Sequence, residues 1–455
     1  MKKVVRAVMI VVITVIAAAF AGCSVFNVFS VDSLIKAPRL TGENAEIQKA
    51  FESAVGKDAV LVRPVSGEYR SAYVLRDYDG DGENEAIVFY TPKDTAGEVR
   101  MHFLEYNGDE KEWQTIADVK GNGSDVHSIA FCNFDRDPVS EIVVAWAFAD
   151  GQKDKMLTVY RYEKNDTDEN DFVGLASVRI SDYNCMDIDF DGAQELVYTI
   201  IDAASEKPAA QLRALKFDIA SKRFVPLSEV QLDGRIISFI NYSHDLKAGN
   251  YRFYIDSALP DNKRMTEIVI YDYSRSAFVR PVDSNGFSLG SVTVRQSQDI
   301  AEDINGDGII EVPLTEPYPK SEILSPQEGK DNIVYVTEYF RLNGEALGSV
   351  GKYYVCSELN LRIKIEKYLE AAFIRVDNAA KSIMFYSYPA ESNQTGKLLF
   401  TVSEKKTDEY TAPSSSEKGT AEAVAVTVTQ EGQSLGITAE SVLADIQSIN
   451  TGRAQ

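Results

Sequence analysis

Apolar positions recur every second residue in short runs over much of the chain, as in the segment KMLTVYRY at residues 155–162. Such alternation indicates half-buried β-strands. The runs fall into four groups of four. They predict strands at residues 71–76, 85–91, 99–106 and 113–119; 126–132, 141–148, 155–162 and 172–180; 184–186, 195–201, 211–217 and 224–230; and 235–242, 251–257, 266–273 and 277–282. The pattern predicts a mainly β protein built from repeated four-stranded units.

An acidic loop follows the first strand of the first group. In the sequence DYDGDGENE, Asp77, Asp79, Asp81 and Glu85 stand at positions 1, 3, 5 and 9 around a glycine, Gly82, at position 6. Calcium takes six to eight oxygen ligands, and a residue that tolerates positive φ allows the chain to turn sharply around the ion. The spacing therefore predicts a calcium loop.

The loop recurs in register along the chain. The further candidate ligands are Asp187, Asp189, Asp191 and Glu195; Asp303, Asn305, Asp307 and Glu311; and, in a weaker copy, Asn133, Asp135, Asp137 and Glu141. In the weaker copy Pro138 stands where the turn needs positive φ, so we expect that metal site to be weak or empty. The first residues of the loops lie 56, 54 and 116 residues apart. The last interval is about twice the others, so one repeat has lost its loop near residues 241–245.

A repeat of this length with four strands is typical of propeller blades. The loop pattern, followed by an apolar strand such as residues 85–90, resembles the FG-GAP/VCBS repeat of integrin-alpha-like proteins. The resemblance implies a β-propeller over residues 58–344 with bound Ca²⁺, five blades being favoured and six or seven possible. It leaves the function open, because such blades occur in adhesion receptors, secreted enzymes and scaffolds.

The fifth repeat, from about residue 291 to residue 342, lacks a clear outer strand. Residues 59–65 share the sequence VRPV with residues 279–282, which close the fourth repeat. We therefore expect residues 59–65 to be the outer strand of the fifth blade. That pairing would close the ring and cover an edge that otherwise promotes aggregation.

The N-terminus has the features of a bacterial lipoprotein signal. Lys2, Lys3 and Arg6 precede an apolar run too short to span a membrane comfortably, and the sequence FAGC that ends at Cys23 resembles a lipobox. This predicts a signal peptide at residues 1–22, a lipid on Cys23, and a location on the extracytoplasmic face of the cell membrane. The alternative is an ordinary secretory signal with a chance cysteine.

Residues 23–57 are expected to form a tether and a short helix, which Thr41 caps and Gly56 ends. Residues 345–455 predict a small α+β domain with a helix capped at Thr438. Its expected strands lie at residues 353–356, 361–366, 372–376, 382–386, 398–402 and 423–428. The pair 383–386 and 398–402 resembles a module of lipoproteins from Gram-positive bacteria.

The chain carries 69 acidic and 47 basic residues, a formal charge of −22. Nucleic acid is therefore excluded as a partner, because affinity for phosphate backbones needs clustered basic residues. Cys132, Cys185 and Cys356 show neither zinc-site nor disulfide-framework spacing, and we expect small core side chains. A bridge between Cys132 and Cys185 remains the alternative.

Three histidines and no recognisable catalytic motif predict no enzyme activity. His102 is expected at the surface and His244 in the lost fourth loop. The leading hypothesis is a membrane-anchored, extracytoplasmic, calcium-binding propeller lipoprotein. It would act as a binding or scaffold module for a cell-envelope partner, such as a cell-wall polymer or a surface protein. The alternative is a secreted carbohydrate-active hydrolase or lyase whose carboxylates converge on the propeller channel.

Overall fold

A computed structural model gives the structure of the chain. It describes residues 42–448 except 96, 150–153, 165–170, 203–208, 234–235, 246–248, 284, 298, 325, 327–331, 345, 357–358, 366–371, 390–393 and 406–423. The signal peptide, Cys23, most of the tether and Thr41 therefore lie outside the described residues. No helix within them is long and apolar enough to cross a membrane.

The protein is mainly β, and its described residues form six sheets; the first four follow the chain order, whereas the strands of the last two alternate along the chain. Sheet one contains β1 (Val60–Leu61), β2 (Tyr73–Arg76), β3 (Glu85–Thr91), β4 (Arg100–Asn107) and β5 (Glu112–Lys120). Sheet two contains β6 (Asp125–Cys132), β7 (Glu141–Ala147), β8 (Lys155–Tyr162) and β9 (Phe172–Ile180). Sheet three contains β10 (Asp182–Met186), β11 (Glu195–Asp202), β12 (Ala209–Asp218) and β13 (Arg223–Gln231).

The last three sheets are less uniform. Sheet four contains β14 (Ile236–Asp245), β15 (Asn250–Ala258), β16 (Arg264–Asp272) and β17 (Ala277–Val279), and the 3₁₀ helix η1 (Leu289–Thr293) follows it. Sheet five contains β18 (Val312–Pro317), β20 (Tyr335–Asn343), β21 (Ala346–Cys356), β22 (Leu361–Lys364) and β27 (Ile446–Ser448). Sheet six contains β19 (Ser321–Leu324), β23 (Phe373–Asp377), β24 (Ser382–Tyr386), β25 (Leu398–Glu404) and β26 (Val424–Val428).

The sixteen strands predicted by the alternating pattern are confirmed, with ends that differ by a few residues. In sheets two to four, neighbours in sequence are neighbours in the sheet and pair antiparallel. The parallel pair β19–β23 in sheet six is the exception to this meander. Local pairing of this kind follows from short connections, which allow each strand to fold back on the one before it.

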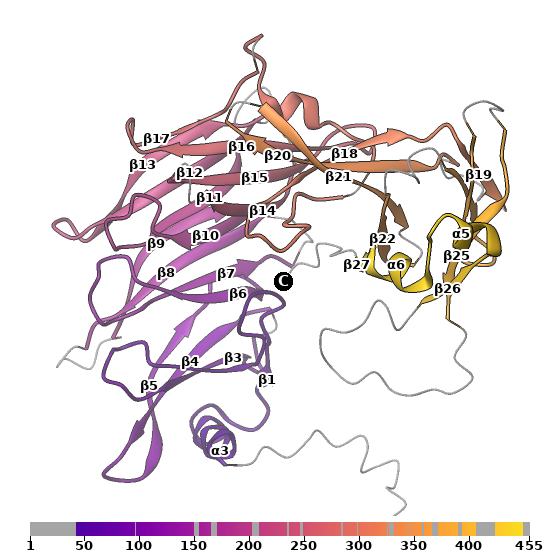
Figure 1. Ribbon diagram of the computed structural model, residues 1–455. Helices are drawn as coiled ribbons and strands as arrows, with labels where there is room; N and C mark the ends of the chain where they lie inside the picture. Colours follow the sequence, from indigo (N-terminus) through magenta and orange to yellow (C-terminus); the bar gives the residue numbers. More distant parts are fainter. Residues whose placement is uncertain are drawn as a thin grey trace, which may run out of the picture.

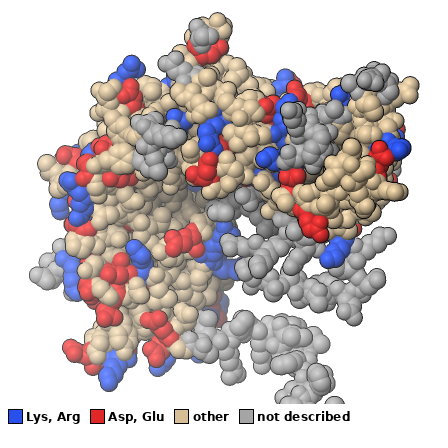
Figure 2. Space-filling model, viewed as in Figure 1, with Lys and Arg blue, Asp and Glu red and all other residues tan. Residues whose placement is uncertain are grey.

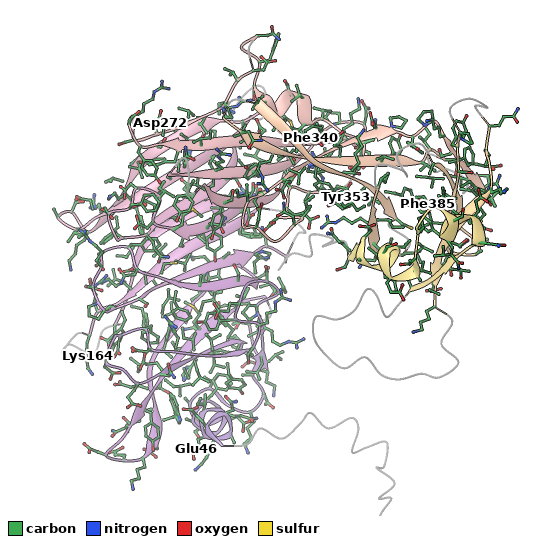
Figure 3. All side chains as sticks on the ribbon, in the orientation of Figure 1. Glu46, Lys164, Asp272, Phe340, Tyr353 and Phe385 are labelled. Atoms are coloured by element: carbon green, nitrogen blue, oxygen red, sulfur yellow. The ribbon has the colours of Figure 1, made fainter. Side chains whose placement is uncertain are left out.

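Successive sheets pack face to face and form a row (Figure 1). Tyr78, Phe103, Trp146 and Phe172 fill the space between sheets one and two. Similar clusters lie between each later pair of sheets, and Figure 3 shows side chains throughout these layers. Because each sheet contacts mainly its neighbours, the core is divided into layers along the row.

Helix α3 (Glu43–Val55) covers the free face of sheet one. Ile47 and Phe51 are its buried residues, as its apolar stripe predicts, and Gly56 ends it with φ of 102°. The residue that precedes the helix at its N-cap is Gly42, so the expected cap at Thr41 is wrong by one residue. A face covered by a helix is closed to a further sheet. Sheet one therefore ends the row.

The expected closing strand is wrong. β1 pairs with β3 inside sheet one, with Val60 opposite Thr91. In sheet five β20 pairs instead with β21 across a tight turn at Gly344 (φ 60°), and β22 and β27 continue the sheet beyond β21. The physical reason is that a short hairpin costs little loop-closure entropy, whereas pairing residues 59–65 with residues 335–343 would close a loop of most of the chain. β20 and β21 therefore pair across the domain boundary that the sequence places after residue 344.

The junction between sheets four and five is held by charged groups as well as apolar ones. Arg295 donates to Asp256 at 2.8 Å, and both side chains are fully buried. Asp256 also accepts hydrogen bonds from Thr266 and from the backbone N–H of Ala301. Buried charges are tolerated when they are paired and hydrogen-bonded in this way.

The C-terminal part confirms the predicted cap of the last helix. In α6 (Ala439–Ala444) Thr438 accepts a hydrogen bond from the N–H of Ser441, whose hydroxyl accepts in return from the N–H of Thr438. This reciprocal capping box satisfies two backbone donors that a helix end leaves unpaired. A shorter helix, α5 (Gln430–Ser434), precedes it.

Candidate functional site

The four acidic loops share one backbone frame. Loop one (77–85) follows β2, loop two (133–141) follows β6, loop three (187–195) follows β10, and loop five (303–311) lies directly before β18. Each loop ends at a buried glutamate. One oxygen of that glutamate accepts from the backbone N–H of the second loop residue, at 2.9–3.1 Å in all four loops. The other oxygen is left for the interior of the loop.

The sharp turns of loops one and five occur where the sequence places glycine, whereas loops two and three have a non-glycine residue with positive φ at the fourth position. In loops one and five both the fourth and the sixth residues are glycines with positive φ, and in loop three Gly192 is at 91°. In loop two Pro138 occupies the sixth position, and Arg136 at the fourth carries the left-handed conformation with φ of 69°. A non-glycine residue at this position costs about 1–2 kcal/mol, a strain that loop two shares with loop three, where Phe190 has φ of 57°.

Loop one gathers its carboxylates into a cage. Ligand oxygens of Asp77, Asp79 and Glu85 lie within 4.8 Å of one another. Burial raises the pKa of Glu85 to about 7, a hydrogen bond from the N–H of Tyr78 opposes the rise, and the charges of Asp79 and Asp81 add to it. The cage is therefore a place where negative charge is crowded and a cation would be stabilised.

A charged residue on a neighbouring strand, which is β4, β8, β12 or β20, lies beside each cage. In sheets one, two, three and five the register places one side chain of this strand next to the closing glutamate. The residues at this position are Glu105, Arg161, Lys216 and Arg341. Three of the four are basic, and the exception belongs to loop one.

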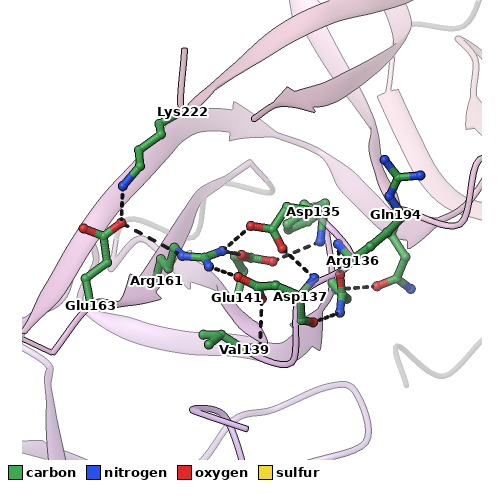
Figure 4. Close-up of polar contacts among 11 residues, drawn as sticks. Asp135, Arg136, Asp137, Val139, Glu141, Arg161, Glu163, Gln194 and Lys222 are labelled. Carbon is green, nitrogen blue, oxygen red and sulfur yellow. Dashed lines mark hydrogen bonds and ion pairs between the residues drawn. The ribbon is translucent and has the colours of Figure 1, made fainter. Parts of the chain in front are cut away.

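In loop two the guanidinium of Arg161 lies among the carboxylates (Figure 4). It donates to Asp135 at 2.7 Å and also to Asp137 and Glu141. Arg161 and Glu141 are both largely buried. These pairs raise the pKa of Arg161 despite its burial. The cage of loop two is therefore neutralised by a side chain of the protein itself.

Loops three and five are neutralised in part. In loop three the ammonium of Lys216 lies 2.6 Å from Asp189 and from Asp191, but 3.9 Å from Glu195. The oxygen Oε1 of Glu195 is buried without a hydrogen-bond partner, and burial raises the pKa of this group to about 7. In loop five Arg341 pairs with Asp307 and Glu311, each at 2.5 Å.

Loop one has an acidic residue where the others have a cation. Carboxylate oxygens of Asp79, Asp81 and Glu105 lie within 4.8 Å of one another. In the part of the chain that the structure describes, no basic side chain forms a salt bridge with loop one, although the charge of Lys164 reaches Asp79 through space. Five carboxylates thus surround loop one, including one that the sequence pattern did not identify.

The loops contact one another along the row of sheets. The N–H of Ser140 in loop two donates to the carbonyl of Tyr78 in loop one at 2.8 Å. A Cβ at Gly80 would lie 2.7 Å from Pro138. Loop two contacts loop three through Arg136, which donates to the carbonyl of Asp191 at 2.9 Å. A change in one loop is therefore passed directly to its neighbour.

The fourth repeat has a hairpin in place of a metal loop, as the sequence predicts. β14 and β15 pair directly, and His244 lies opposite Tyr251. The tip of loop three covers this hairpin. Phe190, with φ of 57°, stacks its ring on those of Tyr251 and Tyr273. Aromatic packing thus takes the place of the lost acidic loop.

His102 is buried, so its expected surface position is wrong. It is 2% exposed because helix α3 covers its face of sheet one, and the Phe51 ring packs 5.5 Å from it. Its Nδ1 lies 2.9 Å from Asp118, and its Nε2 lies 3.0 Å from Thr115. Linear spacing gave no signal of this group, because cross-strand register brings the three side chains together.

A cavity of about 510 Å³ opens on the inner edge of the row, where the first strands of the sheets lie. Its walls offer aromatic rings and polar groups: Tyr69, Arg76, Phe131, Tyr183, Asn184, Gln194 and Tyr242. Cys132 and Cys185 also line it, and both are free thiols. A cavity of this size suits a small ligand or part of a larger one. Over the face in Figure 2, acidic and basic side chains are interspersed.

Comparisons with known proteins add little to this picture. No protein-family model matches the chain, and no curated protein matches it. Among solved structures, Sqt1 of Saccharomyces cerevisiae is 10% identical, with a TM-score of 0.29 over 72% of this chain and 79% of Sqt1. The periplasmic gluconolactonase PpgL of Pseudomonas aeruginosa is 12% identical, with a TM-score of 0.26 over 76% of this chain and 89% of PpgL. Likenesses this distant carry no argument about activity.

Proposed function

We propose that the protein is a lipid-anchored, extracytoplasmic binding or scaffold module, built from propeller-type blades and stabilised by calcium. The observation that supports it best is the cage of loop one. Its carboxylates converge, and the position that holds a cation in the sister loops is Glu105. A site that crowds acidic oxygens and lacks an internal cation suits a hard divalent ion.

The residues that would hold calcium follow from the donor set. In loop one they are Asp77, Asp79, Asp81 and Glu85, with Glu105 as an added ligand. Loop three and loop five offer similar sets, but there calcium would compete with Lys216 and Arg341. Loop two is the poorest candidate, since Arg161 already neutralises it. Calcium would supply charge neutralisation and rigidity, and the neighbouring loop contacts would carry that rigidity along the row.

The binding role is supported by the cavity on the inner edge. It is formed by several sheets at once, so its shape depends on how the sheets pack, and stiffening the loops would hold that shape. Its aromatic and amide side chains suit a cell-envelope polymer or surface protein as partner. The location rests on the sequence that ends at Cys23.

One experiment tests the calcium part of this proposal. Calcium titration by calorimetry should show saturable binding to the full chain and little binding at the strongest site in Glu105→Arg, which introduces the cation that the sister loops carry. Glu83→Arg provides a matched control, since Glu83 is an exposed residue of the same loop outside the ligand positions. Equal binding by both variants would refute the role of the cage.

A second experiment tests the anchor. Membrane fractionation of cells that produce Cys23→Ala should show the protein released or unprocessed. Unchanged membrane retention together with an unchanged N-terminus would refute lipidation at Cys23.

A further inference from the structure

A hydroxyl, an imidazole and a carboxylate lie side by side beneath helix α3 and are linked by hydrogen bonds. Thr115 Oγ1 lies 3.0 Å from Nε2 of His102, and Nδ1 of the same ring lies 2.9 Å from Oδ2 of Asp118. Asp118 also accepts from the hydroxyl of Tyr90 at 2.6 Å and from Arg100 at 2.5 Å. Burial alone would raise the pKa of Asp118, but the hydrogen bonds from His102, Tyr90 and Arg100 hold it below its usual range.

The ionised carboxylate determines the direction of the hydrogen bonds. Because Asp118 can only accept, Nδ1 of His102 carries the proton, and Nε2 presents its lone pair to the hydroxyl of Thr115. This is the order of an activated nucleophile: a hydroxyl beside a base that a third group orients.

Cross-strand register and one β-bulge bring these three side chains together. His102 lies directly opposite Asp118, and Leu104 lies opposite Thr115. The extra residue of the bulge, Ile116, brings Thr115 onto the same face as Asp118 although the two are three positions apart. Bulges re-aim side chains in this way next to functional sites.

The nucleophile and its base differ in access to solvent. His102 is 2% exposed, whereas Thr115 is exposed and lines a cavity of about 480 Å³ between α3 and β5. Lys49, Ser53 and Lys111 also line this cavity. Glu46 and Glu112 line it too, so a ligand that enters the cavity meets the hydroxyl of Thr115 among both basic and acidic side chains.

We propose that Thr115, His102 and Asp118 form a nucleophilic triad that hydrolyses small acyl esters in this cavity, an activity beyond the binding role. Thr115 Oγ1 attacks the ester carbonyl carbon, and its proton passes to Nε2 of His102. The bond from that carbon to the alcohol oxygen then breaks, and the departing alcohol takes the proton from Nε2. Asp118 positions the ring and stabilises its protonated form.

The second half of the reaction restores the protein. A water molecule attacks the acyl-Thr115 carbonyl and gives a proton to Nε2, the bond to Oγ1 breaks, and Oγ1 recovers that proton as the carboxylic acid leaves. Lys49 and Lys111 on the cavity wall are the candidate donors for the negative oxygen that develops on the carbonyl. No other reactant is required.

The test uses the full chain, a fluorophosphonate probe and p-nitrophenyl acetate. The expected result is a single adduct on Thr115, located by peptide mass mapping, and ester hydrolysis that falls at least about 100-fold in Thr115→Ala. Thr115→Ser should keep both the labelling and the turnover. Thr95→Ala, which removes an exposed hydroxyl from the connection between β3 and β4, should leave both unchanged.

The roles of His102 and Asp118 are separated from folding by two readouts. His102→Gln should remove the rise of rate with pH, and Asp118→Asn should lower kcat with little change in KM, at temperatures where circular dichroism shows each variant folded. No adduct on Thr115, or hydrolysis unaffected by Thr115→Ala, would overturn the proposal. The hydrogen bonds among the three side chains would then only join β4 to β5. Calcium binding and membrane anchoring are measured independently, so their failure would not be confused with this one.

Discussion

Loop one and loop two have the same backbone frame, but they differ in the charge of the side chain that faces their crowded carboxylates. Both bury their closing glutamate and hold the second loop residue with it. Loop two places the guanidinium of Arg161 among its carboxylates, whereas loop one faces Glu105. The comparison teaches that the loop geometry does not require a metal ion. A cation is needed, and the chain can supply it from the neighbouring strand, as β8 does with Arg161.

The largest effect is expected from removing the internal cation of loop two. Arg161→Met should lower the free energy of unfolding by about 3–5 kcal/mol, because it leaves buried carboxylates without their partner. Chemical denaturation measures this. Glu105→Met at the equivalent position of loop one should cause no such loss in the absence of calcium, since it removes a like charge. Similar losses of stability from the two variants would contradict the inferred difference between loop one and loop two.

A smaller effect is expected at the contact between the two loops. Gly80→Ala should cost about 2–4 kcal/mol, because Gly80 has φ of 81° and a Cβ there would lie 2.7 Å from Pro138. Gly306→Ala in loop five is the matched control, with φ of 76° and open space around the new Cβ. It should cost only about 1–2 kcal/mol, the conformational part. Equal costs would show that the loop contact contributes nothing.

Calcium removal should have a more modest effect. With a Kd of about 10⁻⁴ to 10⁻³ M, each filled site stabilises the fold by roughly 0.4–1.4 kcal/mol at about 1 mM calcium. A chelator should therefore lower the melting temperature by a few degrees without unfolding the chain. Asp79→Ala should reduce that shift, and Asp135→Ala should not, since loop two holds Arg161. A melting temperature indifferent to the chelator would contradict the metal proposal.

The smallest effect is expected in loop three, which lies between the two extremes. Lys216→Met should lower stability without calcium by about 0.5–1 kcal/mol, because the pair it removes is partly exposed. It should also increase the calcium-dependent rise in melting temperature, since the ion no longer competes with an ammonium. Thermal scans with and without calcium measure both changes. A calcium response that stays the same would show that Lys216 does not occupy the site.

Much of the fold could be predicted from local pattern. The period of two located the strands of sheets one to four, and the capping residues located the start of α6 at Thr438 and the end of α3 at Gly56. The ligand positions of loop one also converge as their spacing implied. These features depend on residues a few positions apart, whose relation is set by strand and turn geometry.

Other features needed the pairing of distant segments. Glu105 and Arg161 are ordinary charged residues of a strand in the sequence, and only the register places them beside their loops. His102 looked exposed because its covering helix lies some fifty residues earlier. The expected ring closure failed for the same reason, since a shared VRPV motif says nothing about which strand is already paired.

The sequence by itself determined that the chain is mainly β, where the strands of sheets one to four lie to within a few residues, and which loops gather acidic oxygens. These are consequences of short-range sterics and of alternation between buried and exposed positions. The tertiary structure decided which cage receives a cation from the chain, which face of sheet one is covered, and which side chains join Thr115. Those outcomes depend on contacts between strands and helices far apart in sequence, where a shift of one residue in register exchanges one face for the other.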